Sequence, residues 1–431
     1  MRAPRFVQDE PSDGEPLETR VTQFAVEQTD SFLDTVDKTP PVSRRASALT
    51  ELALAVGSFA IGTGEFAIMG LLPNVANGLA ITTPEAGHII SAYALGVVIG
   101  APLIAVSAAK LSRRFLLLAM MVIFALANIA SALAPDYGSL LIFRFLSGMP
   151  HGAYFGVAAL VAASMVPHNK RTQAVGRVML GLTVATLIGT PFTTYVGQIF
   201  GWRSLFAIVG GIGAVTFALI WVLLPQDKVQ EGASFTRELG AFRRKQVWYT
   251  LGIAAIGFGG MFSMFSYIAD TAMQVAGMSQ STVPLIMALF GAGMVLGNIA
   301  GAWLADRSLM GTIGWVLVMD VIVLGIFALT ASSPVVLSIC VFLIGCSVAI
   351  GPALQTRLMD VAGDAQTLAA ALNHSAFNIA NALGAWLGGL AIAWGYGLAA
   401  TGWVGAALAA CGLVIFALSM ASDRRRVLRA A

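Results

Sequence analysis

Charged residues are scarce in this chain. Of its 431 residues, 11% are Asp, Glu, Lys or Arg, and 57% are hydrophobic. A soluble globular domain carries about 25% charged residues, so this composition excludes one. The formal net charge of +3 comes from basic residues spread along the chain rather than gathered on one face. We therefore expect no nucleic-acid partner.

Reactive and cofactor-binding patterns are also lacking. Cys340, Cys346 and Cys411 lie inside apolar stretches without metal-ligand or CxxC spacing, so we interpret them as small core residues. The sequence has no GxxxxGK[ST] phosphate loop, so any pumping must use an ion gradient. It shows no spacing of nucleophiles, metal ligands or paired carboxylates typical of an enzyme. We expect no metal and no cofactor.

Long apolar runs are abundant. The chain breaks into about twelve apolar stretches of roughly 20 residues, the length that crosses a hydrocarbon core of ~30 Å. The predicted spans are 49–72, 85–109, 115–134, 138–166, 174–198, 203–224, 247–272, 283–305, 312–331, 335–355, 366–393 and 397–421.

Positive charge falls almost entirely in alternate gaps between these spans. The basic residues of those gaps and of the chain's end include Lys110, Arg113, Arg114, Lys170, Arg171, Arg177, Arg237, Arg243, Arg244, Lys245, Arg307, Arg357, Arg424, Arg425, Arg426 and Arg429. The other gaps hold only Arg203. Because positive loops stay on the cytoplasmic side, we expect a multi-pass inner-membrane protein with both termini in the cytoplasm.

The spans divide into two sets of six. We expect a disordered acidic tail at 1–48, six-helix bundles at 49–224 and 247–421, a cytoplasmic linker at 225–246, and a basic tail at 422–431. The first 48 residues contain no apolar core of a signal peptide, so none is expected. A six-plus-six plan is common among transporters built from internal repeats.

Several sequence stretches carry a resemblance to a known family. They are GTGEFAIMGLLP (62–73), RFLSGMPHGAYFGVAALVAA (144–163), GLTVATLIGTPFTTYVGQIFGWR (181–203), GNIAGAWLADR (297–307), LQTRLMDVA (354–362) and ALNHSAFNIANALGAWLGG (371–389). Together they resemble the major facilitator superfamily, in its drug:proton antiporter branch, and within it the arabinose-efflux-permease-like and chloramphenicol-resistance-like exporters. The resemblance covers about 49–421. It implies an all-α membrane protein of two six-helix bundles, in which spans 1, 4, 7 and 10 line a central cavity.

Two charged residues stand deep inside apolar spans. Glu65 lies fourteen residues into the first span, where a central acid costs about 3 kcal/mol to insert. Such a group suits proton carriage, although a structural carboxyl is the alternative. Arg144 lies in the fourth span and matches the RxxxG motif that the resemblance ties to proton movement, with an interhelical anchor as the alternative. His151, seven residues on, shares its helix face to within about 20° and is either a proton-coupling or a core residue.

The fifth span resembles the antiporter signature helix of the superfamily. Gly181 begins a run rich in threonine and glycine, which passes through Thr190 and Pro191. The order Gly189-Thr190-Pro191 departs from the usual Gly-Pro, and Thr193 replaces an expected glycine. The resemblance implies export, and a packing stripe is the plainer interpretation.

A charged cytoplasmic gate is the next implied feature. The loop after the second span keeps Lys110, Arg113 and Arg114 but has Ala109 where the family has an acid. The equivalent loop of the second half keeps Asp306 and Arg307. These five charged residues either form the gate or anchor the topology.

Further polar residues lie in the second half. We expect Asp270, near the outer end of the seventh span, to contact substrate or to be an exposed helix end. For Asp320, in the ninth span, we expect a partner or a path to the cytoplasm rather than a transport role. Asn373, His374, Asn378 and Asn381 lie together on the eleventh span, where they either face the substrate cavity or bond between helices.

The expected function is a proton-driven antiporter that exports a small molecule, such as a sugar, nucleoside or phenicol-like antibiotic, by alternating access. Its expected partners are the substrate, protons and the bilayer, and the fold can work as a monomer. A metabolite facilitator or symporter and a non-transporting membrane sensor stay open as alternatives.

Overall fold

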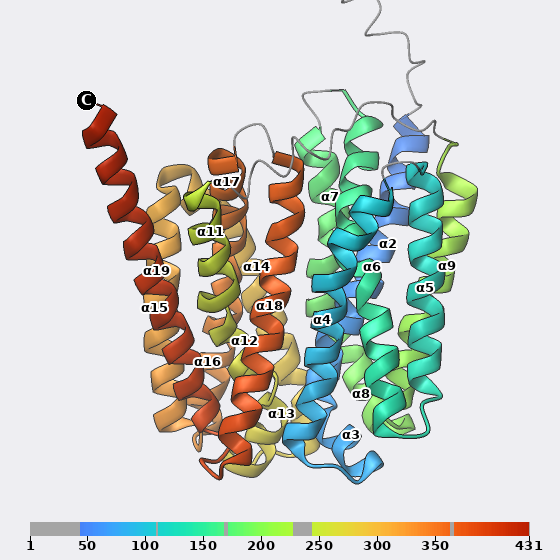
Figure 1. Ribbon diagram of the computed structural model, residues 1–431. Helices are drawn as coiled ribbons and strands as arrows, with labels where there is room; N and C mark the ends of the chain where they lie inside the picture. The colour runs from blue at the N-terminus through green and yellow to red at the C-terminus, as the bar shows by residue number, and fades with distance from the viewer. Residues whose placement is uncertain (1–43, 109–110, 168–170, 227–243, 363–365, 431) are drawn as a thin grey trace, which may run out of the picture. The chain divides into compact units, whose positions relative to one another are not determined.

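The computed structural model describes residues 44–108, 111–167, 171–226, 244–362 and 366–430 (Figure 1). Within these ranges the regular structure is helical, without strands, and 12 helical stretches are long and apolar enough to cross a membrane. The all-α fold and the twelve spans predicted from the sequence are confirmed.

The first six spans are built from eight elements, one of them a π-helix within span 5. They are α2 (Arg44–Gly70), α4 (Thr83–Ala108), α5 (Arg113–Ala132), α6 (Tyr137–Ser164), α7 (Arg171–Val184) with η2 (Ala185–Gly189) and α8 (Thr190–Phe200), and α9 (Arg203–Leu223). A short helix that the sequence did not predict, α3 (Leu72–Leu79), follows span 1.

The last six spans include two that are broken by other helix types. Span 7 comprises α11 (Lys245–Gly252), η4 (Ile253–Gly257), α12 (Gly259–Phe265), α13 (Ile268–Asp270) and η5 (Thr271–Val275). Span 8 is η6 (Gln280–Thr282) with α14 (Val283–Arg307), and span 9 is α15 (Leu309–Thr330). Span 10 is α16 (Pro334–Cys346), η7 (Ser347–Ala349) and α17 (Ile350–Ala362), and spans 11 and 12 are α18 (Gln366–Ala393) and α19 (Ala400–Ala430).

Helix starts follow ordinary capping chemistry. Asp136 accepts a hydrogen bond from the Ser139 amide at 2.8 Å, and the Ser139 hydroxyl completes the capping box of α6. Ser112 caps α5 and Ser308 caps α15 in the same way. Because these side chains satisfy amides that have no partner inside the helix, they fix where the spans begin.

Span 10 ends later in the structure than the sequence predicted. The apolar run ends near residue 355, but the helix continues to Ala362, so Arg357 belongs to α17 rather than to a loop and pairs with Asp423 of α19. Once a helix is nucleated, each further residue adds a hydrogen bond, so it can outrun its apolar stretch. In the same way α2 starts at Arg44 and α19 reaches Ala430, inside the segments expected to be tails. The centre of the expected linker, 227–243, lies outside the described residues.

Packing links the first six spans to the last six along two seams. In one, α18 lies against α4 and α6; in the other, α14 lies against η2 and α8 (Figure 1). One continuous cluster of buried apolar residues runs through both sets of spans. The starts of α5 and α7 and the end of α17 face the top of Figure 1, where the C-terminus is marked. These helix ends carry Arg113, Arg177 and Arg357, so this end of the molecule is called the basic end below. Helices α3 and α13 lie at the opposite end.

Candidate functional site

Glu65 lies where the two seams of spans meet. It is 7% exposed in the interior of α2, and its Oε1 accepts a hydrogen bond from the Asn381 amide of α18 at 3.2 Å. Its neighbour Phe66 packs against Phe262 of α12 and Phe290 of α14, with ring centroids 6.4 and 6.1 Å apart. Span 1 therefore contacts the second half through a carboxylate and an aromatic ring side by side.

Arg144 is fully buried beside this carboxylate. Its Nη2 donates to the carbonyl of Gly64 at 3.2 Å, and the two side chains interact electrostatically without forming a direct ion pair. The guanidinium stacks on the Tyr93 ring at 4.3 Å and lies 5.3 Å from that of Phe206. Its Nε and Nη1 atoms have no hydrogen-bond partner among the described residues. A buried guanidinium with two unused donors is a costly arrangement and is suited to binding an anionic or carbonyl group.

Close helix packing presses Tyr93 against Arg144. A Cβ atom on Gly148 of α6 would lie 2.1 Å from the Tyr93 carbonyl of α4, and one on Gly96 would lie 2.1 Å from the Phe145 carbonyl. Only glycine permits this backbone approach, which is a common way for membrane helices to pack. Spans 2 and 4 are thereby held together on either side of the guanidinium.

An aromatic and imidazole chain extends from Tyr93 to the second half. The Tyr93 hydroxyl lies 3.0 Å from His151 Nδ1, and the His151 ring lies 5.2 Å from that of Phe155. Phe155 stacks on His374 of α18 at 5.4 Å with an interplanar angle of 4°. His151 and His374, two predicted site residues from different halves, are therefore linked through the ring of Phe155.

The fifth span packs tightly on the first. A Cβ on Gly181 would lie 2.1 Å from the carbonyl of Ala55 in α2, and one on Gly189 would lie 2.4 Å from the Thr63 hydroxyl oxygen. The span becomes a π-helix at η2, immediately before Thr190 and Pro191. Because proline has no amide to donate, the local hydrogen bonds shift register there. The buried hydroxyls of Thr63, Thr190 and Thr194 have no partner, so span 1 and span 5 hold several unused polar atoms.

A match to a protein-family model identifies the family of this chain. The model described as Major Facilitator Superfamily matches residues 54–384, which is most of the chain. The chain belongs to the major facilitator superfamily. It is a multi-pass membrane transporter and not an enzyme, as the sequence indicated.

Named relatives agree with the superfamily assignment. The chain is 39% identical over 375 residues to the inner membrane transport protein YdhP of Escherichia coli (strain K12), covering 85% of this chain and 95% of YdhP. It is 34% identical over 348 residues to the putative transporter AraJ of the same strain, covering 80% and 88% of the two chains. The fold is similar to that of a D-xylose-proton symporter, with a TM-score of 0.66 at 16% identity, covering 86% of this chain and 96% of the symporter.

The remaining predicted cavity residues of this major facilitator are bonded within the second half. The Asn373 amide donates to Gln355 of α17 at 2.6 Å, and the Asn378 amide donates to the His374 carbonyl of its own helix at 3.0 Å. Each keeps an amide oxygen without a partner. Asp270 is 1% exposed, so it is not an exposed helix end, and it accepts a hydrogen bond from Gln274 at 2.9 Å.

Two of the predicted gate residues contact tryptophans of their own half. Arg114 donates to the Trp221 carbonyl at 2.6 Å, while Arg307 stacks on Trp303 of its own helix at 3.5 Å and Asp306 is exposed. Arg113 is the first residue of α5, whereas Lys110 lies outside the described residues. The ion pairs of the described basic end, Arg177 with Glu51 and Arg357 with Asp423, each stay within one half.

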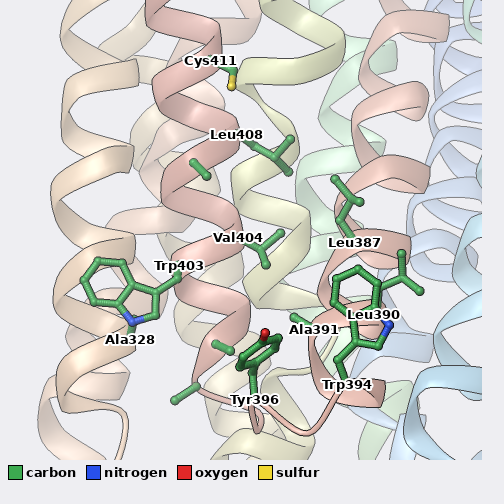
Figure 2. A pocket seen from close by; sticks show the side chains of 13 residues that line it. Ala328, Leu387, Leu390, Ala391, Trp394, Tyr396, Trp403, Val404, Leu408 and Cys411 are labelled. Atoms are coloured by element: carbon green, nitrogen blue, oxygen red, sulfur yellow. The ribbon is translucent and has the colours of Figure 1, made fainter.

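A pocket of about 610 Å³ lies away from this polar cluster. Figure 2 shows it among α15, α18 and α19, with Trp394, Tyr396 and Trp403 near one end and Cys411 at the other. Leu387, Leu390, Val404 and Leu408 make its wall almost wholly apolar. It holds none of the predicted site residues.

Sequence reasoning missed Tyr93 and Glu51. Tyr93 is one aromatic residue in an apolar helix, and nothing in the spacing marks it. Glu51 did leave a trace, because it precedes Glu65 by fourteen residues and so lies within about 40° of the same helix face. Its carboxylate receives hydrogen bonds from Arg177 Nε and Nη2, the latter at 3.1 Å.

Proposed function

We propose that this major facilitator is a proton-coupled exporter of small molecules that works by alternating-access antiport. Its basic end and both termini face the cytoplasm in this proposal, as the distribution of arginine and lysine favours. The observation that carries the proposal is the hydrogen bond between Glu65 and Asn381, which joins an intramembrane acid of the first half to the second half.

Protonation of Glu65 changes the strength of that link. A hydrogen bond to an ionised carboxylate is about twice as strong as one between neutral groups, so an added proton weakens the hold of Asn381 on span 1. Proton uptake therefore loosens one contact between the halves. Proton release restores it. This is the property that a proton-driven change of access requires.

Arg144 determines when the proton leaves. With Glu65 neutral, Arg144 is a buried cation that lacks a countercharge and has two unused donors. A substrate that presents a carbonyl, hydroxyl or anionic group to those donors removes the penalty and competes with Glu65 for the same cation. Substrate and proton then exclude each other, which gives antiport.

We infer the substrate class from the buried side chains that spans 1, 4, 5, 7 and 8 contribute to the interior. Phe66, Phe155, Phe262 and Phe290 provide apolar surface, and the free hydroxyls of Thr63 and Thr190 provide a few polar contacts. Such a lining suits a small amphiphile with several oxygen atoms, such as a sugar, a nucleoside or a phenicol-like antibiotic.

The test is proton movement in proteoliposomes that trap a pH-sensitive dye. Wild type, Glu65→Gln and Glu85→Gln are compared with a panel of such compounds against an imposed pH gradient. Glu85 is the matched control, because its carboxylate bonds locally to Thr82 at the start of α4. We expect that at least one compound drives protons in the direction opposite to its own movement in wild type and in Glu85→Gln. In Glu65→Gln we expect no such proton movement. Protons and compound moving in the same direction would make the protein a symporter, and full coupling in Glu65→Gln would refute this proton pathway.

A further inference from the structure

The apolar pocket of Figure 2 has no part in the proposed transport cycle. It lies among α15, α18 and α19, measures about 610 Å³, and is lined by none of the polar residues around Glu65. Small-molecule sites in proteins usually measure roughly 300–1,000 Å³ and have mostly apolar walls. The pocket therefore has the size and the lining of a ligand site.

The hollow results from small side chains on closely packed helices. α19 lies against α15 at Gly402, where a Cβ would lie 2.7 Å from the Leu324 carbonyl. Toward the pocket, α19 presents Ala400 and Ala407, and α18 presents Ala391. Protein interiors are normally filled to the density of organic crystals, so a space of this size bordered by alanines needs an occupant from outside the chain.

The pocket opens on the surface that faces the bilayer. Its three helices belong to spans 9, 11 and 12 of this multi-pass membrane protein. Trp394, Tyr396 and Trp403 line one end of it and are 70, 72 and 53% exposed. The exposed surface of a membrane span contacts lipid chains rather than water. A lipid is therefore the molecule that covers this opening.

The polar atoms of the wall are distributed as a phospholipid requires. Trp394 and Tyr396 follow the end of α18, on the side of the molecule opposite the basic end, and bring an indole N–H and a phenol O–H. Tryptophan and tyrosine favour this level of a membrane, because their rings are apolar and their polar atoms reach the headgroup region. None of the described lining residues is charged, so the pocket suits an acyl chain and its ester group rather than one particular headgroup.

The depth of the pocket matches one leaflet. Trp403 and Cys411 lie near its two ends and are eight residues apart on α19, about 12 Å of helix. One leaflet contributes about 15 Å to a hydrocarbon core of ~30 Å. An acyl chain that enters beside the aromatic residues can therefore extend along α19 as far as the Cys411 thiol.

We propose that this pocket binds one acyl chain of a phospholipid from the leaflet opposite the basic end, which is the outer leaflet in the proposed orientation. The ester group lies at Trp394, Tyr396 and Trp403, and the chain fills the space beside Ala407. The bound chain becomes part of the packing between spans 11 and 12, unlike lipids that touch the outside of a single helix. This site is independent of Glu65 and of proton coupling.

Photo-crosslinking of the wild-type protein in nanodiscs tests the site. A phosphatidylcholine that carries a diazirine in one acyl chain is included at rising mole fraction, and its adducts are mapped by mass spectrometry. We expect adducts on residues 387–411 to saturate at a low mole fraction, while those on α9 rise in proportion to it. A proportional rise on both segments would mean that the pocket only meets exchanging bulk lipid, and this would overturn the proposal.

Ala407→Phe tests the pocket itself, because a phenyl ring at this exposed alanine fills the space beside the chain. Ala218→Phe is the matched control, since Ala218 is also an exposed alanine but lies on α9, outside the pocket. We expect the saturable adducts to be lost in Ala407→Phe and kept in Ala218→Phe. Saturable adducts that persist in Ala407→Phe would refute the site. Displacement of the wild-type adducts by a phenicol antibiotic, but not by unlabelled phosphatidylcholine, would mark a substrate site instead and would also overturn the proposal. If Ala407→Phe does not fold, the wild-type titration still decides.

Discussion

Tyr93 connects Arg144 and His151, the two parts of the polar cluster on span 4. Its ring supports the Arg144 guanidinium and its hydroxyl contacts His151, so one side chain connects the cation beside Glu65 with the histidines. Arg144 and His151 both lie on α6, about two helical turns apart, but their common partner comes from α4. The link therefore arises from packing rather than from either helix alone.

Tyr93→Phe separates these two roles of Tyr93. The substitution keeps the ring under Arg144 and removes the bond to His151, which is worth about 0.5–1.5 kcal/mol. We expect a folded protein whose transport falls by about 2- to 10-fold and whose dependence on pH changes, because His151 loses its neighbour. Tyr137→Phe is the control: Tyr137 contacts His88 at 2.8 Å in a similar but exposed pair. Equal pH profiles for wild type and Tyr93→Phe would remove His151 from the coupling pathway.

Asn381→Ala tests the link between the halves at the residue scale. Removing a donor to an ionised group costs about 1.5–3 kcal/mol, so we expect coupled proton release to fall by about 10- to 100-fold. The protein should still fold, because Glu65 keeps its place on span 1. Asn128→Ala provides the comparison, since Asn128 is equally buried but bonds to the Phe124 carbonyl of its own helix. A similar loss in both variants would point to stability rather than coupling.

At the scale of single helices, span 5 first packs closely on span 1 and then departs from regular α-helix. Gly181 lets α7 lie against α2, and the π-helix of η2 follows before Pro191. On the other side of this segment, a Cβ on Gly291 of α14 would lie 2.4 Å from the Thr186 carbonyl. Span 5 therefore packs closely between span 1 and span 8. A displacement of either of these spans must also displace span 5.

Two glycines of the same helix should respond in opposite ways to alanine. Gly181→Ala places a methyl group 2.1 Å from a backbone oxygen, and such overpacking costs about 1–3 kcal/mol. Gly176→Ala meets nothing within 4 Å and should gain up to about 1 kcal/mol of helix propensity. We expect the melting temperature in detergent to fall for Gly181→Ala and to hold or rise for Gly176→Ala. A Gly181→Ala protein as stable as wild type would mean that spans 1 and 5 do not rely on this contact.

At the scale of the whole molecule, the features that could be predicted from the sequence are those that hydrophobicity and charge determine. Twelve spans follow from apolar length, and Glu65 and Arg144 stand out because charge is costly in a membrane. Contacts between distant residues are not encoded in this way: Asn381 lies 316 positions from Glu65, and the amide pattern of span 11 does not indicate which amide faces it. Likewise the Arg357–Asp423 pair joins residues 66 positions apart, and no local pattern reveals it.

The two halves also meet at the end opposite the basic end. There Gln198, near the end of α8, donates to the carbonyl of Gln280 at 2.9 Å, and Ser91 of α4 donates to the Ala382 carbonyl of α18 at 3.2 Å. By contrast, the ion pairs described at the basic end stay within one half. The molecule is therefore joined across its halves at the end that the proposed orientation assigns to the outside.

Locking that outer contact should stop the transport cycle. With Gln198→Cys and Gln280→Cys joined by a short reducible bis-thiosulfonate linker, the halves cannot separate at this end, and alternating access requires them to do so. We expect transport in proteoliposomes to be abolished by the linker and restored by dithiothreitol. Gln198→Cys alone, treated identically, controls for reaction at Cys340, Cys346 and Cys411. Full transport by the linked double variant would show that the end carrying Gln198 and Gln280 does not open during the cycle, and the conformational change would then have to be sought elsewhere in the molecule.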